Sequence, residues 1–279
     1  MGQKNNLRLN KSVTFLLLCV GLFIVILPLW YMIVTSFKPQ TMVFEMPPRL
    51  WPQQWTLNNY IAALGKENFG LYFVNSSIVT ILTTLGTTLI ASMLAFVFTK
   101  MHFPGKEAIF YVFLLGMMVP PVMLIIPQFL VAKNLGLTNH LQGLFLVYIT
   151  MNLPMQTFLL RGVFEGIPRE LEEAALIDGG NRWTIFRHII LPNSGPGLAV
   201  VIINTFLYSW EEFPWANVLM TNSKMRTLPV GIALFQSAHL TEWGQVFAAS
   251  LVALIPVIII FSIFQRYFVQ GIATTGLKG

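Results

Sequence analysis

Long uncharged apolar runs constrain this chain more than any other feature. Residues 13–37 hold no Asp, Glu, Lys or Arg over 25 positions, which is enough to cross a hydrocarbon core about 30 Å thick as a tilted helix. Similar runs recur along the sequence, which is 55% hydrophobic and 10% charged with a mean hydropathy of +0.69. Soluble domains carry about 25% charged residues. The chain is therefore predicted to be an integral membrane protein.

The apolar runs predict an all-α fold with six transmembrane helices in a single domain, residues 1–279. The first run has no signal-peptide cleavage site and is expected to be retained. Residues 38–69 are expected to form an ordered external loop that ends in a short helix. We expect Pro120, Pro121 and Pro127 to interrupt the third span, and Asn152, Pro154 and Gln156 the fourth. The predicted spans are approximately 13–37, 72–98, 109–131, 141–160, 197–216 and 246–264.

The distribution of basic residues predicts the orientation. An even number of spans places both termini on one side, and that side holds 11 of the 17 Lys and Arg residues. The positive-inside rule therefore predicts cytoplasmic termini and a cytoplasmic loop at residues 161–195. The net charge of +6 does not indicate nucleic acid, because the basic residues are scattered and form no patch.

Residues 170–192, ELEEAALIDGGNRWTIFRHIILP, are the one charged segment with helical patterning. Glutamates at its start suit the positive end of a helix. Gly179 and Gly180 can adopt the left-handed backbone that ends a helix, and Asn181 can cap a second one. Leu191-Pro192 is expected to end that second helix. The segment is predicted to be two short helices joined by a glycine turn.

Three interpretations of this helical pair were weighed. A DNA-binding helix-turn-helix is disfavoured, because residues 161–192 hold four Arg against five Asp and Glu and would meet phosphates with carboxylates. A plain connecting loop has no need of such length and structure. The third interpretation is a docking element for a soluble cytoplasmic partner, whose basic residues would meet the glutamates. This interpretation is favoured.

The same segment resembles a known signature. Glu173-Ala174-Ala175, Gly179, Ile189 and Leu191-Pro192 match the spacing of the EAA motif in membrane (permease) subunits of ABC importers. Further stretches, among them NSSIVT from Asn75, PPVMLIIPQF, RTLPVGI and QRYFVQGI, are similar to the carbohydrate-uptake branch, of the MalG-like maltose type. One departure is Trp210-Glu211-Glu212, where this branch commonly has Trp-Asn-Glu or Trp-Asn-Asp.

The resemblance implies a function, partners and site residues. It implies a permease subunit that forms half of the path for a sugar or oligosaccharide, in a bacterial inner membrane. The implied partners are a second homologous permease subunit, two ABC ATPase subunits and an extracytoplasmic solute-binding protein, with no nucleic acid. ATP and Mg²⁺ would be bound by the ATPase subunits, and no cofactor by this chain. The implied ATPase-coupling residues are Glu172, Glu173, Ala174, Ala175, Asp178, Gly179, Gly180, Ile189, Leu191 and Pro192.

Polar residues in or near the spans are candidates for the translocation path, because hydroxyl-rich solutes need amide and phenol partners. The candidates are Gln128, Asn152, Gln156, Asn204, Tyr208 and Glu211; the alternative is that such groups hold helices together. Glu211 and Glu212 either lie at the outer interface or line a wet path. A loop at 221–243 is expected to face the binding protein through Lys224, Arg226, Pro229 and Gln236, or to be a plain connector. The tail with Gly276 and Lys278 either contacts the ATPase pair or is frayed.

The chain is not expected to be an enzyme. It has no GxxxxGK[ST] phosphate loop, and its four histidines show no HExxH or similar metal-ligand spacing. Two alternatives remain open from the sequence alone. One is an ABC permease for a solute other than a sugar. The other is a secondary transporter driven by an ion gradient, with Glu211 or Glu212 as the ion-coupled carboxylate.

Overall fold

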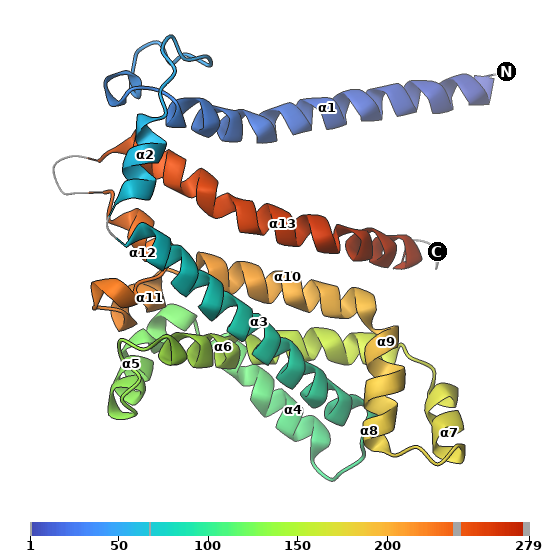
Figure 1. Cartoon of the computed structure of the whole chain (residues 1–279). Helices are drawn as coiled ribbons and strands as arrows, with labels where there is room; N and C mark the ends of the chain where they lie inside the picture. The colour runs from blue at the N-terminus through green and yellow to red at the C-terminus, as the bar shows by residue number, and fades with distance from the viewer. Residues whose placement is uncertain (1, 67, 237–240, 276–279) are drawn as a thin grey trace. The chain divides into compact units, whose positions relative to one another are not determined.

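The chain is helical in the computed structural model, which describes residues 2–66, 68–236 and 241–275 (Figure 1). Over these residues the β-structure is one isolated bridge, between Gln236 and Thr241. Four helices are long and apolar enough to cross a membrane, and two further pairs qualify if each bent pair is one span. The prediction of an all-α membrane fold is confirmed in this respect, whereas the number of spans stays a prediction.

The described chain divides into two compact units. The first comprises residues 1–69 and 232–254, and the second comprises residues 70–231 and 255–279. The first unit holds α1 (Gly2–Ser36), α2 (Asn58–Gly65), the beginning of α13 (Trp243–Thr275) and one or two end residues of two helices that lie mainly in the second unit. A short 3₁₀-helix, η1 (Gln40–Met42), follows α1.

Side-chain hydrogen bonds order the connection after α1. Asn59 of α2 donates from Nδ2 to the carbonyl oxygens of Ser36 at 2.8 Å and Lys38 at 2.7 Å. The buried ammonium of Lys38 lies 3.2 Å from the Glu45 carboxylate and donates to the Arg49 carbonyl at 2.9 Å. These contacts satisfy polar groups that an apolar setting would otherwise leave unpaired. The predicted ordered loop that ends in a short helix is confirmed.

The second unit holds the long helices around which the candidate site is built. They are α3 (Phe69–Lys100), α6 (Leu141–Glu165) and α10 (Gly195–Glu211). Small residues allow close approach between them. A Cβ on Gly197 of α10 would lie 2.7 Å from a Val163 methyl of α6, and one on Gly86 of α3 would lie 2.6 Å from Ile149. Glycine at these positions lets the helices pack closely, as in other membrane bundles.

Shorter helices complete the second unit. They are α4 (Lys106–Leu115), η2 (Gly116–Met118), η3 (Pro121–Leu124), α5 (Ile125–Asn134), α7 (Arg169–Ile177), α8 (Arg182–Ile185), the π-helix η4 (Phe186–Ile190), α9 (Leu191–Asn193), α11 (Pro214–Leu219), η5 (Ser223–Met225) and α12 (Leu228–Ala233). The last two residues of α12 fall in the first unit.

Prolines break the predicted third span but not the fourth. The helical segments 106–118 and 121–134 meet at an angle of 90°, since Pro120 and Pro121 cannot donate backbone hydrogen bonds and exclude a continuous helix. Pro127 lies in the first turn of α5, where a missing N–H costs little. The expected break near Pro154 was wrong, because α6 continues through this residue. Buried residues of α6 on either side of Pro154, such as Tyr148 and Leu160, hold the helix in place by packing. The free energy of this packing outweighs that of one lost hydrogen bond.

The predicted fifth span also differs from the structure. It was expected to run to residue 216, but α10 ends at Glu211 and α11 begins at Pro214. Glu212 accepts hydrogen bonds from the backbone amides of Trp215 at 2.7 Å and Ala216 at 3.1 Å. Its side chain therefore caps a new helix, and capping together with proline at the first helical position ends the old one.

Candidate functional site: the α7–α9 knob

The EAA-like residues fold into a small helical projection, which we call the α7–α9 knob (residues 169–193). It lies where α3 and α6 end and where α10 begins (Figure 1). Glu170 and Glu172 occupy the first turn of α7, where carboxylates interact favourably with the positive helix end. The α10 segment leaves the knob at an angle of 80°. The knob therefore connects two long helices through a sharp turn.

A glycine turn joins the two helices of the knob, as predicted. Gly179 has φ +82°, and its amide donates to the Leu176 carbonyl at 3.1 Å. The Gly180 amide donates to the Ala175 carbonyl at 2.8 Å, and a Cβ on Gly180 would lie 2.7 Å from that oxygen. The first glycine supplies the left-handed backbone and the second supplies the close approach.

Asn181 caps the second helix, as predicted. Its Oδ1 accepts from the Thr184 amide at 2.9 Å and from the Thr184 hydroxyl at 3.1 Å. The first amides of a helix have no hydrogen-bond partner within the helix, and the Thr184 amide is one of them. The Asn181 side chain supplies that partner.

The second helix does not end at Leu191-Pro192, so that expectation was wrong. A π-helical turn at 186–190 precedes the proline and α9 continues to Asn193. Because proline has no N–H, the carbonyl one turn earlier in a helix loses its usual hydrogen-bond donor. Here Asn193 donates to the Ile189 carbonyl at 2.7 Å and the Ser194 hydroxyl donates to the Ile190 carbonyl at 2.6 Å. The wider turn and these side chains supply hydrogen bonds where the proline disturbs the helix.

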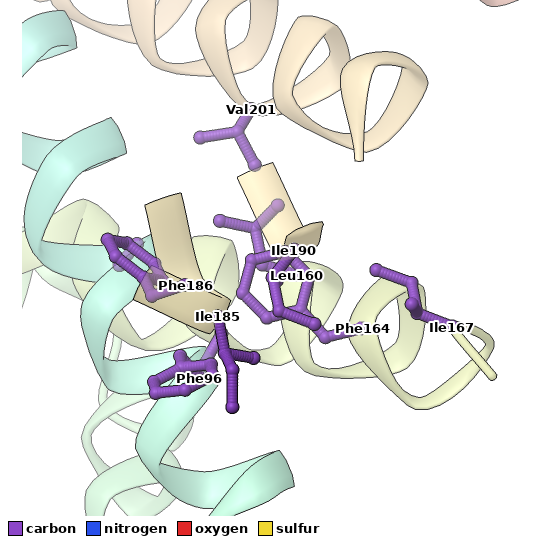
Figure 2. Packing of buried hydrophobic residues seen from close by; sticks show 10 residues of the cluster. Phe96, Leu160, Phe164, Ile167, Ile185, Phe186, Ile190 and Val201 are labelled. Carbon is purple, nitrogen blue, oxygen red and sulfur yellow. The ribbon is translucent and has the colours of Figure 1, made fainter. Parts of the chain in front are cut away.

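One face of the knob is fixed to the long helices by a buried apolar cluster. Ile185, Phe186 and Ile190 are buried against residues of α3, α6 and α10 (Figure 2). The rings of Phe96 and Phe186 have centroids 5.3 Å apart. Ala175 and Leu191 pack at the edge of the cluster. Because protein interiors are closely packed and resist deformation, this part of the knob is firmly attached to the three long helices.

The rest of the knob surface is exposed and mixes apolar side chains with charged ones, among them the basic Arg182 and Arg187. Ile177 is 87% exposed and Trp183 is 54% exposed, and Leu171 and Leu176 are exposed on the same short helix as Ile177. Glu173, Ala174 and Asp178 are exposed too. A surface that mixes exposed apolar side chains with charged ones has the composition of protein-docking surfaces.

An ion pair joins the knob to α3, and another group of charges joins α4 to α6. Glu172 is buried and lies 2.6 Å from Nζ of Lys100, the last residue of α3. Arg161 of α6 pairs with Glu107 at 2.8 Å and with Glu165 at 3.0 Å. Lys100 is not among the site residues expected from the sequence. Its one signal was a lysine at the end of a long apolar run, and only the fold brings it to Glu172.

The candidate path residues lie in the second unit, on three helices. Asn152 and Gln156 are buried on α6, Asn204 and Tyr208 are partly buried on α10, and Glu211 is exposed at the end of α10. Gln128 is partly buried on α5. Asn152 Nδ2 donates to its own helix, to the Tyr148 carbonyl at 2.8 Å.

Tyr148 joins these residues although the sequence analysis missed it. Its ring lies edge-on to Tyr208 with centroids 6.1 Å apart, and its hydroxyl donates to Glu212. The Tyr208 hydroxyl contacts Met151 Sδ at 3.5 Å. The structure thus brings Tyr208 of α10 next to Tyr148 and Met151 of α6. Of the two glutamates, Glu211 is free of a capping role whereas Glu212 is used to start α11.

Side chains also hold part of the predicted binding-protein loop. Asn75 Nδ2 donates to the carbonyls of Lys224 and Arg226, both at 2.9 Å. Lys224 is exposed, and Arg226 and Pro229 are partly buried. Gln236 is exposed in the first unit. Residues 237–240 of this loop, and Gly276 and Lys278 of the tail, lie outside the described residues.

Comparison with known proteins identifies the family. A family model described as "Binding-protein-dependent transport system inner membrane component" matches residues 87–274. The chain belongs to this family.

Two relatives match nearly the whole of this inner-membrane component. It is 36% identical over 260 residues to the trehalose/maltose transport system permease protein MalG of Thermococcus litoralis, covering 92% of each chain. It is 35% identical over 257 residues to the diacetylchitobiose uptake system permease protein NgcG of Streptomyces coelicolor, covering 91% of this chain and 85% of the relative. The predicted resemblance to carbohydrate-type ABC importer permeases is confirmed.

A solved structure shares the fold of this inner-membrane component. A chain from a bacterial ABC transporter involved in the import of the acidic polysaccharide alginate superposes with a TM-score of 0.82 at 22% identity, over 94% of this chain and 97% of that chain. The matched family region includes the whole α7–α9 knob. Among the described residues, no group of three His, Cys, Asp or Glu side chains is placed to hold a metal ion.

Proposed function

We propose that this chain is the permease subunit of an ATP-driven importer, that it forms half of the translocation path, and that the α7–α9 knob couples it to a partner ATPase. The observation that carries the proposal is the two-sided knob. One face is packed on the ends of three long helices, and the rest of its surface exposes apolar, acidic and basic side chains. Such an element can receive a partner's movement on one side and transmit it on the other.

The coupling residues divide between these two sides. Glu173, Ala174 and Asp178 are exposed and would contact the ATPase, with Glu173 forming a charge-assisted contact to a basic residue there. Gly179 and Gly180 shape the turn. Leu191 would pass the displacement to the long helices through the apolar cluster. ATP and Mg²⁺ would be bound by two partner ATPase subunits and no cofactor by this chain.

We propose a topology of six spans in one membrane domain, counting each bent helix pair as one span. Both termini and the knob would then lie in the cytoplasm, since the side that holds them carries 11 of the 17 Lys and Arg residues. The membrane would be a bacterial inner membrane, in keeping with the family description. Ile189 and Pro192 would lie at the point where the knob returns to the membrane.

The proposed substrate class is sugars or oligosaccharides. Relatives that are 36% and 35% identical over the aligned residues are named for trehalose/maltose and diacetylchitobiose transport. The tyrosine pair and the amides of Asn152 and Gln156 offer the aromatic and hydrogen-bonding groups that sugars need. Asn204, Gln128 and Glu211 would complete this half of the path, with a second homologous permease subunit providing the other half.

An extracytoplasmic solute-binding protein would deliver the substrate. The family description names such dependence. Lys224, Arg226, Pro229 and Gln236 would face the binding protein. The hydrogen bonds from Asn75 fix the backbone around Lys224 and Arg226, so this part of the surface is preorganised for docking.

Reconstitution tests the importer. The chain is purified with its second permease subunit and ATPase in proteoliposomes, with binding protein outside and ATP inside, and sugar uptake is followed. We expect uptake that requires ATP and binding protein and that persists when ion gradients are dissipated. Uptake abolished by an ionophore and indifferent to ATP would overturn the proposal in favour of a gradient-driven transporter.

The solute is tested separately. The cognate binding protein is heated with a panel of mono- and oligosaccharides, amino acids and peptides, and its melting temperature is recorded. A ligand at 100 times its Kd stabilises the folded state by about 2.7 kcal/mol, and we expect such a shift from a sugar. A shift with peptides or amino acids alone would reject the sugar class and leave the importer standing.

A further inference from the structure

A buried ion pair ties the α7–α9 knob to the end of α3. Lys100 Nζ lies 2.6 Å from Glu172 Oε1, and the two side chains are only 5% and 9% exposed. The same ammonium donates to the Ile167 carbonyl at 3.1 Å. Ile167 lies between the end of α6 and the start of α7. One lysine thus fastens α3 both to α7 and to the chain that leads into it.

This pair differs from the other ion pairs near the knob. Glu107, which pairs with Arg161, has a side chain that is 50% exposed, so water can replace its partner at little cost. Lys100 and Glu172 are both withdrawn from water, and removing either would leave a buried charge without its partner. The Lys100–Glu172 contact is therefore difficult to break during a conformational change.

The apolar contacts of the knob are unevenly shared between its helices. The buried cluster takes Ile185, Phe186 and Ile190 from the second helix, whereas from α7 only the partly buried Ala175 packs against it. Glu172 is the buried residue of α7. Glu172 lies on the same helical face as Ala175, because Ala175 follows it by three residues. The ion pair is thus the main inward attachment of the helix that carries the exposed Glu173 and Ala174.

We propose that Lys100 and Glu172 are positioning residues that act as a strut, through which movement of α7 is transmitted to α3. The inference rests on the proposed function, because it takes α7 to be the element a partner ATPase moves. Glu173 is exposed at the edge of the cavity beside the pair and would meet the partner, whereas its neighbour Glu172 is buried against the end of α3. Without the strut, α7 still engages the ATPase but pivots on the glycine turn, and α3 does not follow.

The cavity beside the strut determines which variants are informative. Its volume is about 200 Å³, and its lining includes Arg169 and Arg182 besides the pair itself. If Lys100 is lost, an arginine from this lining can approach Glu172, but from α7 or α8 and not from α3. Lys100→Met therefore removes the link between helices without requiring Glu172 to stay unpaired. Glu172→Gln removes the charge from the other side.

The experiment measures coupling and attachment separately. Lys100→Met, Glu172→Gln and the charge exchange Lys100→Glu/Glu172→Lys are compared with Glu107→Gln, which breaks an exposed ion pair between α4 and α6. In proteoliposomes of the full complex, solute uptake per ATP hydrolysed is measured for each. In the same preparations, hydrogen exchange of the 169–178 amides reports how firmly α7 is held.

We expect each single variant to hydrolyse ATP near the wild-type rate while uptake per ATP falls about tenfold, within the 5- to 150-fold range of coupling between sites. In the same variants the rate of hydrogen exchange at the 169–178 amides rises. The double variant Lys100→Glu/Glu172→Lys restores part of the uptake per ATP and part of the amide protection, and Glu107→Gln changes neither quantity. The strut is overturned if the single variants keep wild-type coupling and exchange, or if the exchanged pair is as defective as the singles.

Failure of the proposed function gives a different result. If the wild-type complex shows no ATP-driven uptake, the importer proposal fails. The comparison of hydrogen exchange between Lys100→Met and Glu107→Gln then still decides whether the ion pair holds α7 in place, because it needs no transport. A variant that does not fold loses protection from hydrogen exchange throughout the chain and not at 169–178 alone. In that case the double variant Lys100→Glu/Glu172→Lys decides. Recovered protection in the double variant supports the ion pair, and absence of recovery overturns it.

Discussion

The glycine turn of the α7–α9 knob allows a graded test of its geometry. Gly179 has φ +82° with open space around its missing side chain, so backbone strain is the dominant effect of a substitution there. Alanine in the left-handed region costs about 1–2 kcal/mol, whereas asparagine tolerates it. Proline cannot reach this φ, and it removes the amide that donates to Leu176 at 3.1 Å, for a cost of about 3 kcal/mol or more.

These costs predict an order of defects, with Gly179→Asn mildest, Gly179→Ala intermediate and Gly179→Pro most severe. A loss of 1–2 kcal/mol multiplies the open population of the turn by about 5–30. Amide exchange at residues 178–180, which donate hydrogen bonds back to α7, rises by the same factor. Uptake per ATP falls in the same order, and Gly179→Pro uncouples transport from hydrolysis.

Gly162→Ala is the matched control. Gly162 lies within α6 with nothing within 4 Å of an added Cβ, so alanine there adds helix propensity without strain. Equal behaviour of Gly179→Ala and Gly179→Asn would refute the argument from backbone strain. Normal uptake by Gly179→Pro would refute the role of the turn in coupling.

Three further substitutions test the knob and its attachment. Glu173→Lys is expected to uncouple uptake from ATP hydrolysis in proteoliposomes, because a cation replaces the exposed carboxylate proposed to meet a basic partner; normal uptake would contradict that contact. Asn181→Ala removes the cap on the Thr184 amide and should lower the free energy of unfolding of the second helix by about 0.5–2 kcal/mol, seen as faster exchange at 182–185 and largely absent in Asn181→Asp. Gly197→Ala places a Cβ 2.7 Å from a Val163 methyl and should lower the melting temperature, with recovery in the double variant Gly197→Ala/Val163→Ala; an unchanged melting temperature would show that α6 and α10 separate easily.

Local rules predicted the knob well because its shape depends on neighbouring residues. The left-handed Gly179, the Asn181 cap and the carboxylates in the first turn of α7 each act over a few positions. The exposed Glu173, however, could not be told from the buried Glu172 by sequence. Both are glutamates in one acidic helix, and only the position of Lys100 at the end of α3 separates them.

Proline signals were reliable where two prolines coincide and unreliable where one stands in a packed helix. Pro120 and Pro121 bend the chain by 90°. Pro154 leaves α6 unbroken, because the free energy lost with one missing hydrogen bond is smaller than the free energy gained by packing a 25-residue helix. Pro192 is accommodated by a π-helical turn, with hydrogen bonds from Asn193 and Ser194 nearby. Tertiary packing thus decided the outcome at Pro154, whereas local hydrogen bonding decided it at the other prolines.

The sequence by itself determined the membrane character, the helical class and the glycine turn of the knob, because apolar run length, charge content and backbone preference are local properties. The tertiary structure alone decided which charged residues point inward. Lys100 and Glu172 are 72 positions apart in the chain, and their ion pair exists because α6 returns the chain to the end of α3. Long-range pairing of this kind follows from how helices pack.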